Sequence, residues 1–287
     1  MKPEELEREL LRNLAQIIGR SQELECRPLL IGGYAVRAYA RMRKRFTEDL
    51  DFVISRHDQG NFIAVLKALG YEYRSETAFG GLKATKPMAG RSLELHISVD
   101  KVWDISSDQT YPLPEDTFDS GQLRVVESYS GEMEATVQVP VIPLEDLLIL
   151  KLMTLRELDT VDTIALLLEN SEQVHIASYR GKVVIAKLTQ HINARIEVIS
   201  QLLKSGQANE VWKKYMGTDL SSGEIRTALT ALKKLVIPTE FICPTSNSPQ
   251  KHVFKTDAPR IDNLGNLYAF CPIHTYTCYE LVSPSSE

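Results

Sequence analysis

The spacing of apolar residues divides the 287-residue chain into a first part that mixes helices with strands and a second part that is helical. Helical spacing predicts an amphipathic helix over the first 20 residues and further helices at 34–43 and 58–69. Short apolar or alternating runs predict strands at 28–33, 48–54, 71–76, 92–99, 122–127 and 135–142. From Pro143 to about Leu235 helical periodicity dominates, with breaks predicted near 170–172, at 206 and at 217–223.

After Pro238 the pattern weakens, and the chain becomes rich in Pro, Thr, Ser and Asn with aromatic residues between them. The sequence therefore predicts three parts, with boundaries at residues 1–142, 143–237 and 238–287. Such a tail of about 50 residues has little core of its own, so it needs a metal or a docking surface to be stable.

Composition and charge narrow the class of protein. The chain is 43% hydrophobic and 25% charged, which is typical of a soluble globular protein. No apolar stretch approaches the roughly 20 residues that span a bilayer, and the charged first segment lacks the apolar region of a secretory signal. We therefore expect a cytoplasmic protein without a membrane partner. The net charge of −5 excludes a surface that is basic all over, so a polyanion would have to meet a local patch.

Two aspartates interrupt the apolar strand at 48–54. Alternation places Asp49 and Asp51 on one face of the strand and Leu50 and Phe52 on the other. The two carboxylates then lie roughly 6–7 Å apart, the spacing of residues two apart on a strand. Two like charges at that spacing repel, and a divalent cation such as Mg²⁺, or Mn²⁺ in its place, removes the repulsion.

A glycine pair precedes the aspartates. Gly32 and Gly33 close the strand at 28–33 and begin a helix, where glycine lets a ligand approach the backbone and the first N–H groups point at an anion. Each motif alone also fits a simple turn or cap. Their order and their spacing of about 16 residues favour a phosphate cradle beside a metal site, as phosphoryl or nucleotidyl transfer requires.

The segments 32-GGYA-35 and 45-RFTEDLD-51 carry a family resemblance. The pattern Gly-Gly-x-Ala followed by Arg-x-Thr-x-Asp-x-Asp resembles the nucleotidyltransferase superfamily with a polymerase-β-like fold. Within it the chain is similar to the AbiEii-type toxins of type IV toxin–antitoxin systems and to minimal nucleotidyltransferases. The resemblance covers roughly residues 29–168, and its first half is the more specific.

The resemblance implies a polymerase-β-like catalytic domain with a mixed sheet, which we place at 1–142. With the helical part and the small zinc-ribbon-like tail that the sequence pattern predicts after it, the expected fold class is α+β. It implies an enzyme that moves an NMP from an NTP to a hydroxyl acceptor, such as an RNA or tRNA end, and an antitoxin protein as partner. Asp49 and Asp51 would ligate Mg²⁺. The nucleotide would be bound by the motif residues Gly32, Gly33, Arg45 and Thr47.

The family usually supplies a third carboxylate from a later strand, and the match here is Glu94 in 93-LELHI-97. Glu94 would take the proton from the acceptor hydroxyl. Glutamate in place of aspartate, with His96 on the same face, is a departure from the family pattern. If Glu94 is only a solvated residue, the alternative is a catalytically impaired module that binds nucleotide, nucleic acid or a protein partner.

Basic residues flank the motif on both sides. The run 37-RAYARMRKR-45 either caps its helix with positive charge or guides a polyanion toward the aspartates. Residues 143–168 read as one helix, on which Lys151 and Asp162 lie eleven positions apart and within roughly 20° of each other. This segment resembles the Lys…Arg-x-x-Asp-x-x-Asp region of AbiEii-type proteins, so Lys151 and Asp162 are expected at the nucleotide. A solvated charged face is the alternative.

The tail holds a Cys-Pro-x-Cys-like pattern twice, in altered form. Cys243, Cys271, His274 and Cys278 together make a Cys₃His set, which a structural Zn²⁺ accepts in tetrahedral geometry. The alternative is a ribbon that has lost its metal and keeps its cysteines as small buried hydrophobic residues.

Overall fold

A mixed sheet forms the centre of the first half of the chain. The computed structural model describes residues 3–76, 81–88, 91–129, 136–243, 252–256, 258–262, 266–273 and 277–279. In spatial order the sheet consists of β3 (Glu72–Glu76), β4 (Gly81–Met88), β5 (Arg91–Val99), β2 (Asp49–Ile54), β1 (Leu29–Ile31), β9 (Thr136–Val141) and β8 (Gln122–Glu127). The β2–β5 and β1–β9 pairs are parallel and the other pairs antiparallel, which confirms a mixed sheet.

Alternation along β5 shows why this sheet has one dry face and one face open to a site. Leu93, Leu95 and Ile97 are buried, whereas Glu94 and His96 between them are partly exposed. The strands expected from the sequence are present. The strand β4 was not predicted, because its segment GLKATKPM has few apolar residues and contains a proline.

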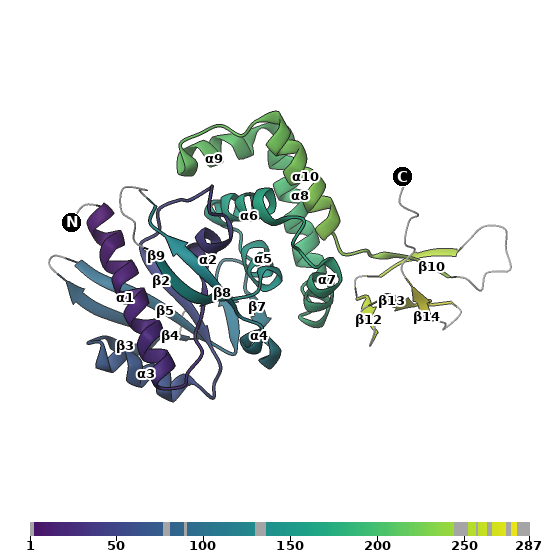
Figure 1. The fold of residues 1–287 in the computed structure, drawn as a ribbon. Helices are drawn as coiled ribbons and strands as arrows, with labels where there is room; N and C mark the ends of the chain where they lie inside the picture. The colour runs from purple at the N-terminus through teal and green to yellow at the C-terminus, as the bar shows by residue number, and fades with distance from the viewer. Residues whose placement is uncertain are drawn as a thin grey trace.

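Helices cover the sheet (Figure 1). The amphipathic helix α1 (Pro3–Glu23) contacts β9 and α3 (Gln59–Ala68), and it buries the stripe that includes Leu6, Leu10, Leu14 and Ile17. The helix α2 (Gly32–Tyr39) is shorter than expected. It ends because the backbone turns at Ala40 and the Asn170 side chain donates a hydrogen bond to the Tyr39 carbonyl.

The second part is helical, as predicted. It contains α5 (Leu144–Met153), α6 (Glu157–Asn170), α7 (Ile176–Ile185), α8 (Thr189–Ser205), α9 (Gln207–Met216) and α10 (Ser222–Leu235). The breaks predicted at Gly206 and Gly217 are confirmed, and both glycines have positive φ. The single helix expected over 143–168 is wrong, because the chain breaks between α5 and α6 where the Thr154 hydroxyl donates to Asp159.

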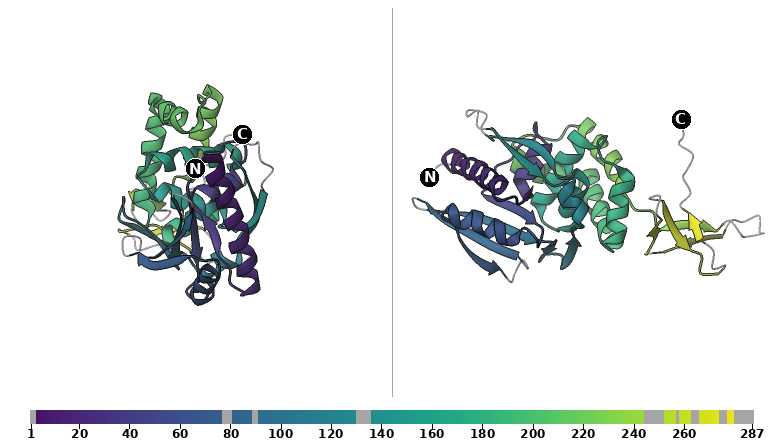
Figure 2. Two further views of the ribbon diagram at one scale, coloured as in Figure 1. Left: turned by 90° about the vertical axis from the view of Figure 1, so that its left-hand side faces the viewer. Right: turned by 60° about the horizontal axis from the view of Figure 1, so that its bottom comes forward.

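One hydrophobic cluster runs through the sheet, the six helices above and the described part of the tail. The helix α2 contacts both α5 and α6, which places the helical part directly against the glycine turn. The division at residues 142 and 237 into separate domains therefore stays a prediction. In Figure 2 the tail extends away from the helices at the far end from α1.

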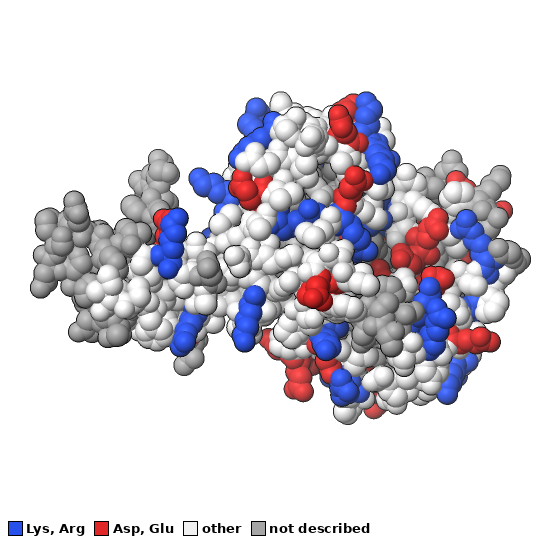
Figure 3. Space-filling model, turned by 180° about the vertical axis from the view of Figure 1, so that it is seen from behind, with Lys and Arg blue, Asp and Glu red and all other residues white. Residues whose placement is uncertain are grey.

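Short strands complete the described chain. A hairpin of β6 (Lys101–Asp104) and β7 (Gln109–Pro112) follows β5, and the short helix α4 (Glu115–Asp119) precedes β8. The tail holds β10 (Glu240–Cys243), β11 (His252–Lys255), β12 (Arg260–Ile261), β13 (Leu267–Phe270) and β14 (Thr277–Tyr279). None of the described helices is both long and apolar enough to cross a bilayer. On the face shown in Figure 3, basic and acidic side chains are intermixed.

Candidate active site

A cavity of about 330 Å³ lies where the glycine turn, the strands β2 and β5, the β6–β7 hairpin and the helices α5 and α6 meet. Most of the site residues expected from the sequence line it: Gly32, Gly33, Arg45, Thr47, Asp49, Asp51 and Lys151. Asp162 and Glu94 do not line it. Arg156 and Asp159 of the Arg-x-x-Asp-x-x-Asp segment also line it, as do residues that the sequence did not single out, namely Ser98, Trp103, Asp104 and Ser106.

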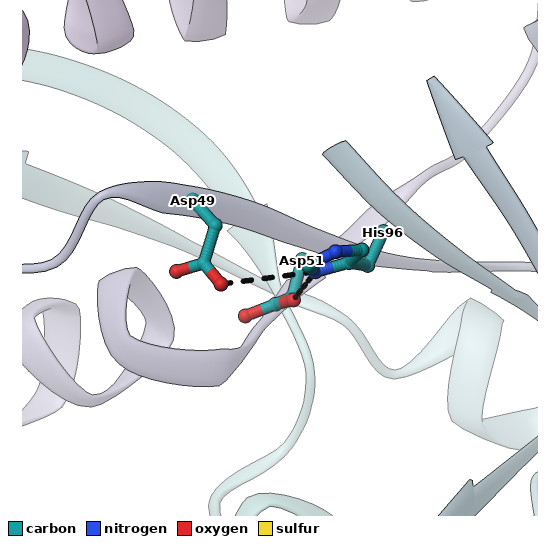
Figure 4. A group of neighbouring side chains, drawn as sticks. All are labelled: Asp49, Asp51 and His96. Carbon is teal, nitrogen blue, oxygen red and sulfur yellow. Dashed lines mark hydrogen bonds and ion pairs between the residues drawn. The ribbon is translucent and has the colours of Figure 1, made fainter. Parts of the chain in front are cut away.

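The two aspartates converge with a histidine on the wall of this cavity (Figure 4). The parallel register of β2 and β5 sets Asp51 opposite His96 and Asp49 opposite Glu94. Nδ1 of His96 lies 3.1 Å from Oδ1 of Asp51 and 3.7 Å from Oδ2 of Asp49. One ligand atom from each of the three residues lies within 4.8 Å of the others. The expected convergence of the two carboxylates is thus present in the structure.

Burial, and after it the charge of Asp51, raises the pKa of Asp49 above its usual value. The pKa of His96 is raised by its hydrogen bond to Asp51, which outweighs the opposing effect of burial. The negative charge of a neighbouring aspartate contributes to both shifts. The donor set of two carboxylates and an imidazole therefore fits a divalent cation.

Glu94 faces a different partner. Its carboxylate lies 2.7 Å from Nζ of Lys83, and its side chain is 44% exposed. It lines a second, more open hollow of about 720 Å³, which Asp49, Arg45 and Arg91 also line. The member of β5 that joins the aspartates is His96, and its position two residues after Glu94 on the same strand face was the signal for it in the sequence.

The glycine turn packs directly against the aspartates. Gly32 has φ +68°, and a Cβ built on it would lie 1.9 Å from Oδ2 of Asp51. A Cβ on Gly33 would lie 2.8 Å from Oγ1 of Thr47 and 3.1 Å from Nη2 of Arg45. No side chain caps the N-terminus of α2 at Ile31. The turn therefore keeps backbone N–H groups beside the carboxylates, as an anion cradle requires.

Four buried charges form an ion-pair network at a further wall of the cavity, which Arg45, Lys151 and Asp159 line and Asp162 backs. Nε and Nη2 of Arg45 donate to the two oxygens of Asp162 at 2.7 and 2.8 Å, a bidentate pair. Nζ of Lys151 lies 2.8 Å from both Asp159 and Asp162. Arg156 adds a third cation, 2.7 Å from Asp159. Lys151 and Asp162 do meet, but across the turn between α5 and α6 rather than along one helix face.

Three cations balance two carboxylates in this wall, so it keeps one positive charge beside the aspartates. Burial works against the carboxylate form of Asp159, but the charges of Lys151 and Arg156 outweigh it and lower the pKa of Asp159 to about 2. Thr47 links the two groups, because its hydroxyl donates to Oδ1 of Asp49 at 3.1 Å while its backbone lies two residues from Arg45. Thr47 thus joins the aspartate pair to the segment that carries Arg45.

The rest of the basic run at 37–45 does not face the cavity. Arg37 is buried and lies 2.6 Å from the buried carboxylate of Glu7. Arg41 and Lys44 pair with Glu127, and Arg43 pairs with Glu169 and Glu224. The placement of these four cations therefore does not support the alternative in which the run guides a polyanion toward the aspartates. Arg45 is the member that reaches the site.

The tail residues proposed for zinc are only partly described. Cys271 and Cys278 are buried, and Cys278 pairs with Ala269, two positions before Cys271. The strand β10, which ends at Cys243, contacts β14. The side chain of Cys243 and the whole of His274 lie outside the described residues. The Zn²⁺ site stays a prediction.

Comparison with known proteins adds a family match. The model of the nucleotidyl transferase AbiEii toxin of type IV toxin–antitoxin systems matches residues 16–165, just over half of the chain. A search of curated proteins finds no match.

Solved structures show more distant likenesses. MenT4, a nucleotidyltransferase toxin from Mycobacterium tuberculosis H37Rv, is 12% identical with a TM-score of 0.40, and the match covers 82% of this chain and 95% of that one. The solution structure of the antibiotic-resistance factor ANT(2″)-Ia is 14% identical with a TM-score of 0.35, covering 70% of this chain and 95% of that one. A crystal structure of ANT(2″)-Ia with adenylyl-2″-tobramycin is 17% identical with a TM-score of 0.31, covering 69% and 99%.

Proposed function

The chain belongs to the AbiEii family of nucleotidyltransferase toxins, and on that basis we propose that it moves an NMP from an NTP to a hydroxyl acceptor with the help of a divalent cation. One observation carries the proposal. Asp49 and Asp51 converge in a single cavity with the Gly32–Gly33 turn, which packs against them. A metal-binding pair and an anion cradle are thus neighbours, as nucleotidyl transfer requires.

Different residues of the cavity bind the polyphosphate, the cation and the rest of the nucleotide. The polyphosphate lies at the N-terminus of α2, where Gly32 and Gly33 expose backbone N–H groups. Asp49 and Asp51 hold the cation, which supplies charge neutralisation at the phosphates when bound. Lys151 offers a cation at the cavity wall, and Asp162 fixes it together with Arg45. Trp103 of the β6–β7 hairpin adds an aromatic wall.

The second hollow is the proposed route for the acceptor. Asp49 lines both hollows, so a hydroxyl that enters from the larger one arrives beside the proposed cation site. The acceptor oxygen forms a bond to the α-phosphorus, the bond to pyrophosphate breaks, and the hydroxyl proton passes to a carboxylate. Glu48, Asp49 and Glu94 are the carboxylates on this hollow, and of these Asp49 and Glu94 are the proposed acceptors of the proton. Arg91 at its rim suits a phosphodiester backbone, so we propose an RNA end, with tRNA to be tested first.

A second function is favoured by the pairing of Glu94. Glu94 pairs with Lys83 and lies outside the group of Asp49, Asp51 and His96. A protein that binds nucleotide without transferring it would not need Glu94 in that group. In either case we expect an antitoxin protein as partner, as the type IV family implies. Co-expression with the neighbouring open reading frame, read out as relief of growth arrest, tests that partnership.

Transfer to RNA separates the two functions. Purified protein is incubated with each α-³²P-labelled NTP, Mg²⁺ or Mn²⁺, and total tRNA, and the RNA is resolved on a denaturing gel. Labelled RNA with the wild type and none with Asp49→Ala supports the enzyme. Asp119→Asn, at an exposed carboxylate outside the cavity, is the matched control and should keep full activity. Binding of NTP without labelled RNA for any acceptor class would support the module.

A further inference from the structure

The aspartate pair has a nitrogen ligand at the place where a third oxygen is expected. Within the described part of the chain, Asp49, Asp51 and His96 are the one group of three side chains whose donor atoms gather closely enough to hold a metal ion. Three carboxylates would carry three negative charges, whereas this group carries two when the imidazole is neutral. The difference changes both the charge and the chemical type of the donor set.

We propose that Nδ1 of His96 is a direct ligand of the cation at Asp49 and Asp51, and that the site therefore selects Mn²⁺ over Mg²⁺. The inference deepens the proposed function and rests on its divalent-cation site. Mg²⁺ strongly prefers oxygen ligands and keeps several waters, whereas imidazole suits first-row transition metals. Among those metals Mn²⁺ also accepts carboxylates as readily as Mg²⁺ does, so it matches the mixed donor set.

The spacing of the donor atoms supports direct ligation. Bonds of about 2.1 Å in an octahedral shell place adjacent ligand atoms about 3 Å apart. The same atom, Nδ1 of His96, lies 3.1 Å from Asp51 and 3.7 Å from Asp49. A histidine that only orients Asp51 through a hydrogen bond has no need to approach Asp49 as well. Ligation would use the lone pair of Nδ1 with the ring proton on Nε2, so a proton on Nδ1 would move to Nε2 or, from the imidazolium, leave to solvent.

The other side of the group is closed, which fixes where the cation lies. Gly32 lies against Asp51 so closely that even a Cβ on it would overlap Oδ2. The side chains of Asp49, Asp51 and His96 are 43%, 23% and 27% exposed, so the cation enters from the cavity. Figure 4 shows the three side chains turned toward one another from β2 and β5.

Metal binding without nucleotide tests the inference. Mn²⁺ is added to the full-length protein, and pulsed EPR measures the coupling of the bound ion to ¹⁴N. Calorimetry then gives the affinities for Mn²⁺ and Mg²⁺ separately. We expect ¹⁴N coupling in the wild type, its loss in His96→Asp, and a fall of at least about tenfold in the ratio of Mn²⁺ to Mg²⁺ affinity in that variant.

The matched control is His57→Asp. His57 is also an imidazole next to a carboxylate, 3.1 Å from Asp58, but it is 95% exposed and outside the cavity. It should keep the ¹⁴N coupling and the affinity ratio of the wild type. His96→Gln serves where His96→Asp unfolds, and circular dichroism checks both. Even if neither variant folds, the presence or absence of ¹⁴N coupling in the wild-type protein decides whether His96 is a ligand.

The outcomes separate this inference from the proposed function. Bound Mn²⁺ without ¹⁴N coupling, or an affinity ratio unchanged by His96→Asp, would mean that His96 only orients Asp51, and the inference would be rejected while the transferase stands. Coupling with no transfer to any acceptor would support the inference and reject the transferase. If the protein binds neither Mn²⁺ nor Mg²⁺, the inference is rejected, because it requires a cation site at Asp49 and Asp51.

Discussion

Gly32 and Asp51 are packed so closely that a Cβ on the glycine would lie 1.9 Å from Oδ2 of the aspartate. The contact joins the two motifs that the sequence separates by most of a helix and a loop. It also explains why glycine is required there twice over, since φ at Gly32 is +68° and the space beside it is filled by the carboxylate. The phosphate cradle and the metal pair are therefore one packed unit.

Gly32→Ala should damage that unit. The alanine pushes Asp51 away from Asp49 and pays about 1–3 kcal/mol of backbone strain, so transfer should fall at least about 100-fold. Labelled-NTP transfer and thermal unfolding are measured together. Gly60→Ala is the matched control, because a Cβ at Gly60 meets nothing within 4 Å in helix α3. It should leave activity unchanged and raise stability by about 0.4–1 kcal/mol.

Asp49→Asn should abolish transfer yet stabilise the protein in the absence of metal. The substitution removes a carboxylate that is repelled by Asp51 and disfavoured by burial, the causes that raise the pKa of Asp49. We expect the Tm in EDTA at pH 7.5 to rise by about 2 °C, the size of a roughly 1 kcal/mol effect in a chain of this length.

In saturating Mn²⁺ the wild type should have a higher Tm than Asp49→Asn, the reverse of the order expected in EDTA. The wild type gains stability from binding, whereas the variant has lost a ligand and gains less. Asp119 is exposed and pairs with Arg27, so Asp119→Asn should show neither effect. An Asp49→Asn variant less stable than the wild type in EDTA would show that the pair is not under repulsion.

The local part of the site was predictable from the sequence, because the two periodicities and the glycine turn act over short stretches of chain. Alternation alone placed Asp49 and Asp51 on one strand face, and the structure has them so. The choice between Glu94 and His96 was not predictable in this way. Both share a face, and the inter-strand register that sets His96 opposite Asp51 is a tertiary property.

Contacts between residues far apart in the sequence could not be predicted from it. Arg45 and Asp162 are 117 residues apart, so no periodicity could reveal their bidentate contact. After Pro143 the run to Leu168 contains no glycine and no further proline, and helical spacing therefore predicted one helix. The break after Met153 depends on the hydrogen bond from Thr154 to Asp159, which competes with the helical backbone.

Lys151→Met should destabilise the protein by about 3–5 kcal/mol, because it leaves Asp159 and Asp162 short of a partner in a buried wall. Urea unfolding measures the loss. The control, Lys214→Met, removes an exposed ion pair with Glu157 and should leave the stability almost unchanged, because solvent screens that pair. A folded Lys151→Met protein of near wild-type stability would contradict the structural role and leave the lysine as a phosphate contact only.

Stability in acid should depend on Asp159. Its pKa of about 2 in the folded protein lies below the value of about 4 expected in the unfolded chain, because Lys151 and Arg156 outweigh burial. The folded state therefore holds the proton less tightly than the unfolded state does. The resulting stabilisation, about 2 kcal/mol, is complete above pH 5 and is lost as the pH falls from about 4 to 2.

Asp159→Asn tests this dependence. The variant is less stable than the wild type at neutral pH, since Lys151 and Arg156 lose a charged partner, but the free energy of unfolding should fall less steeply between pH 5 and pH 3. Urea unfolding at pH 5, 4 and 3 gives both slopes. Asp219→Asn, at an exposed carboxylate paired with Lys213, should leave the slope almost unchanged because solvent screens that pair. Equal slopes in wild type and Asp159→Asn would show that other carboxylates govern acid unfolding.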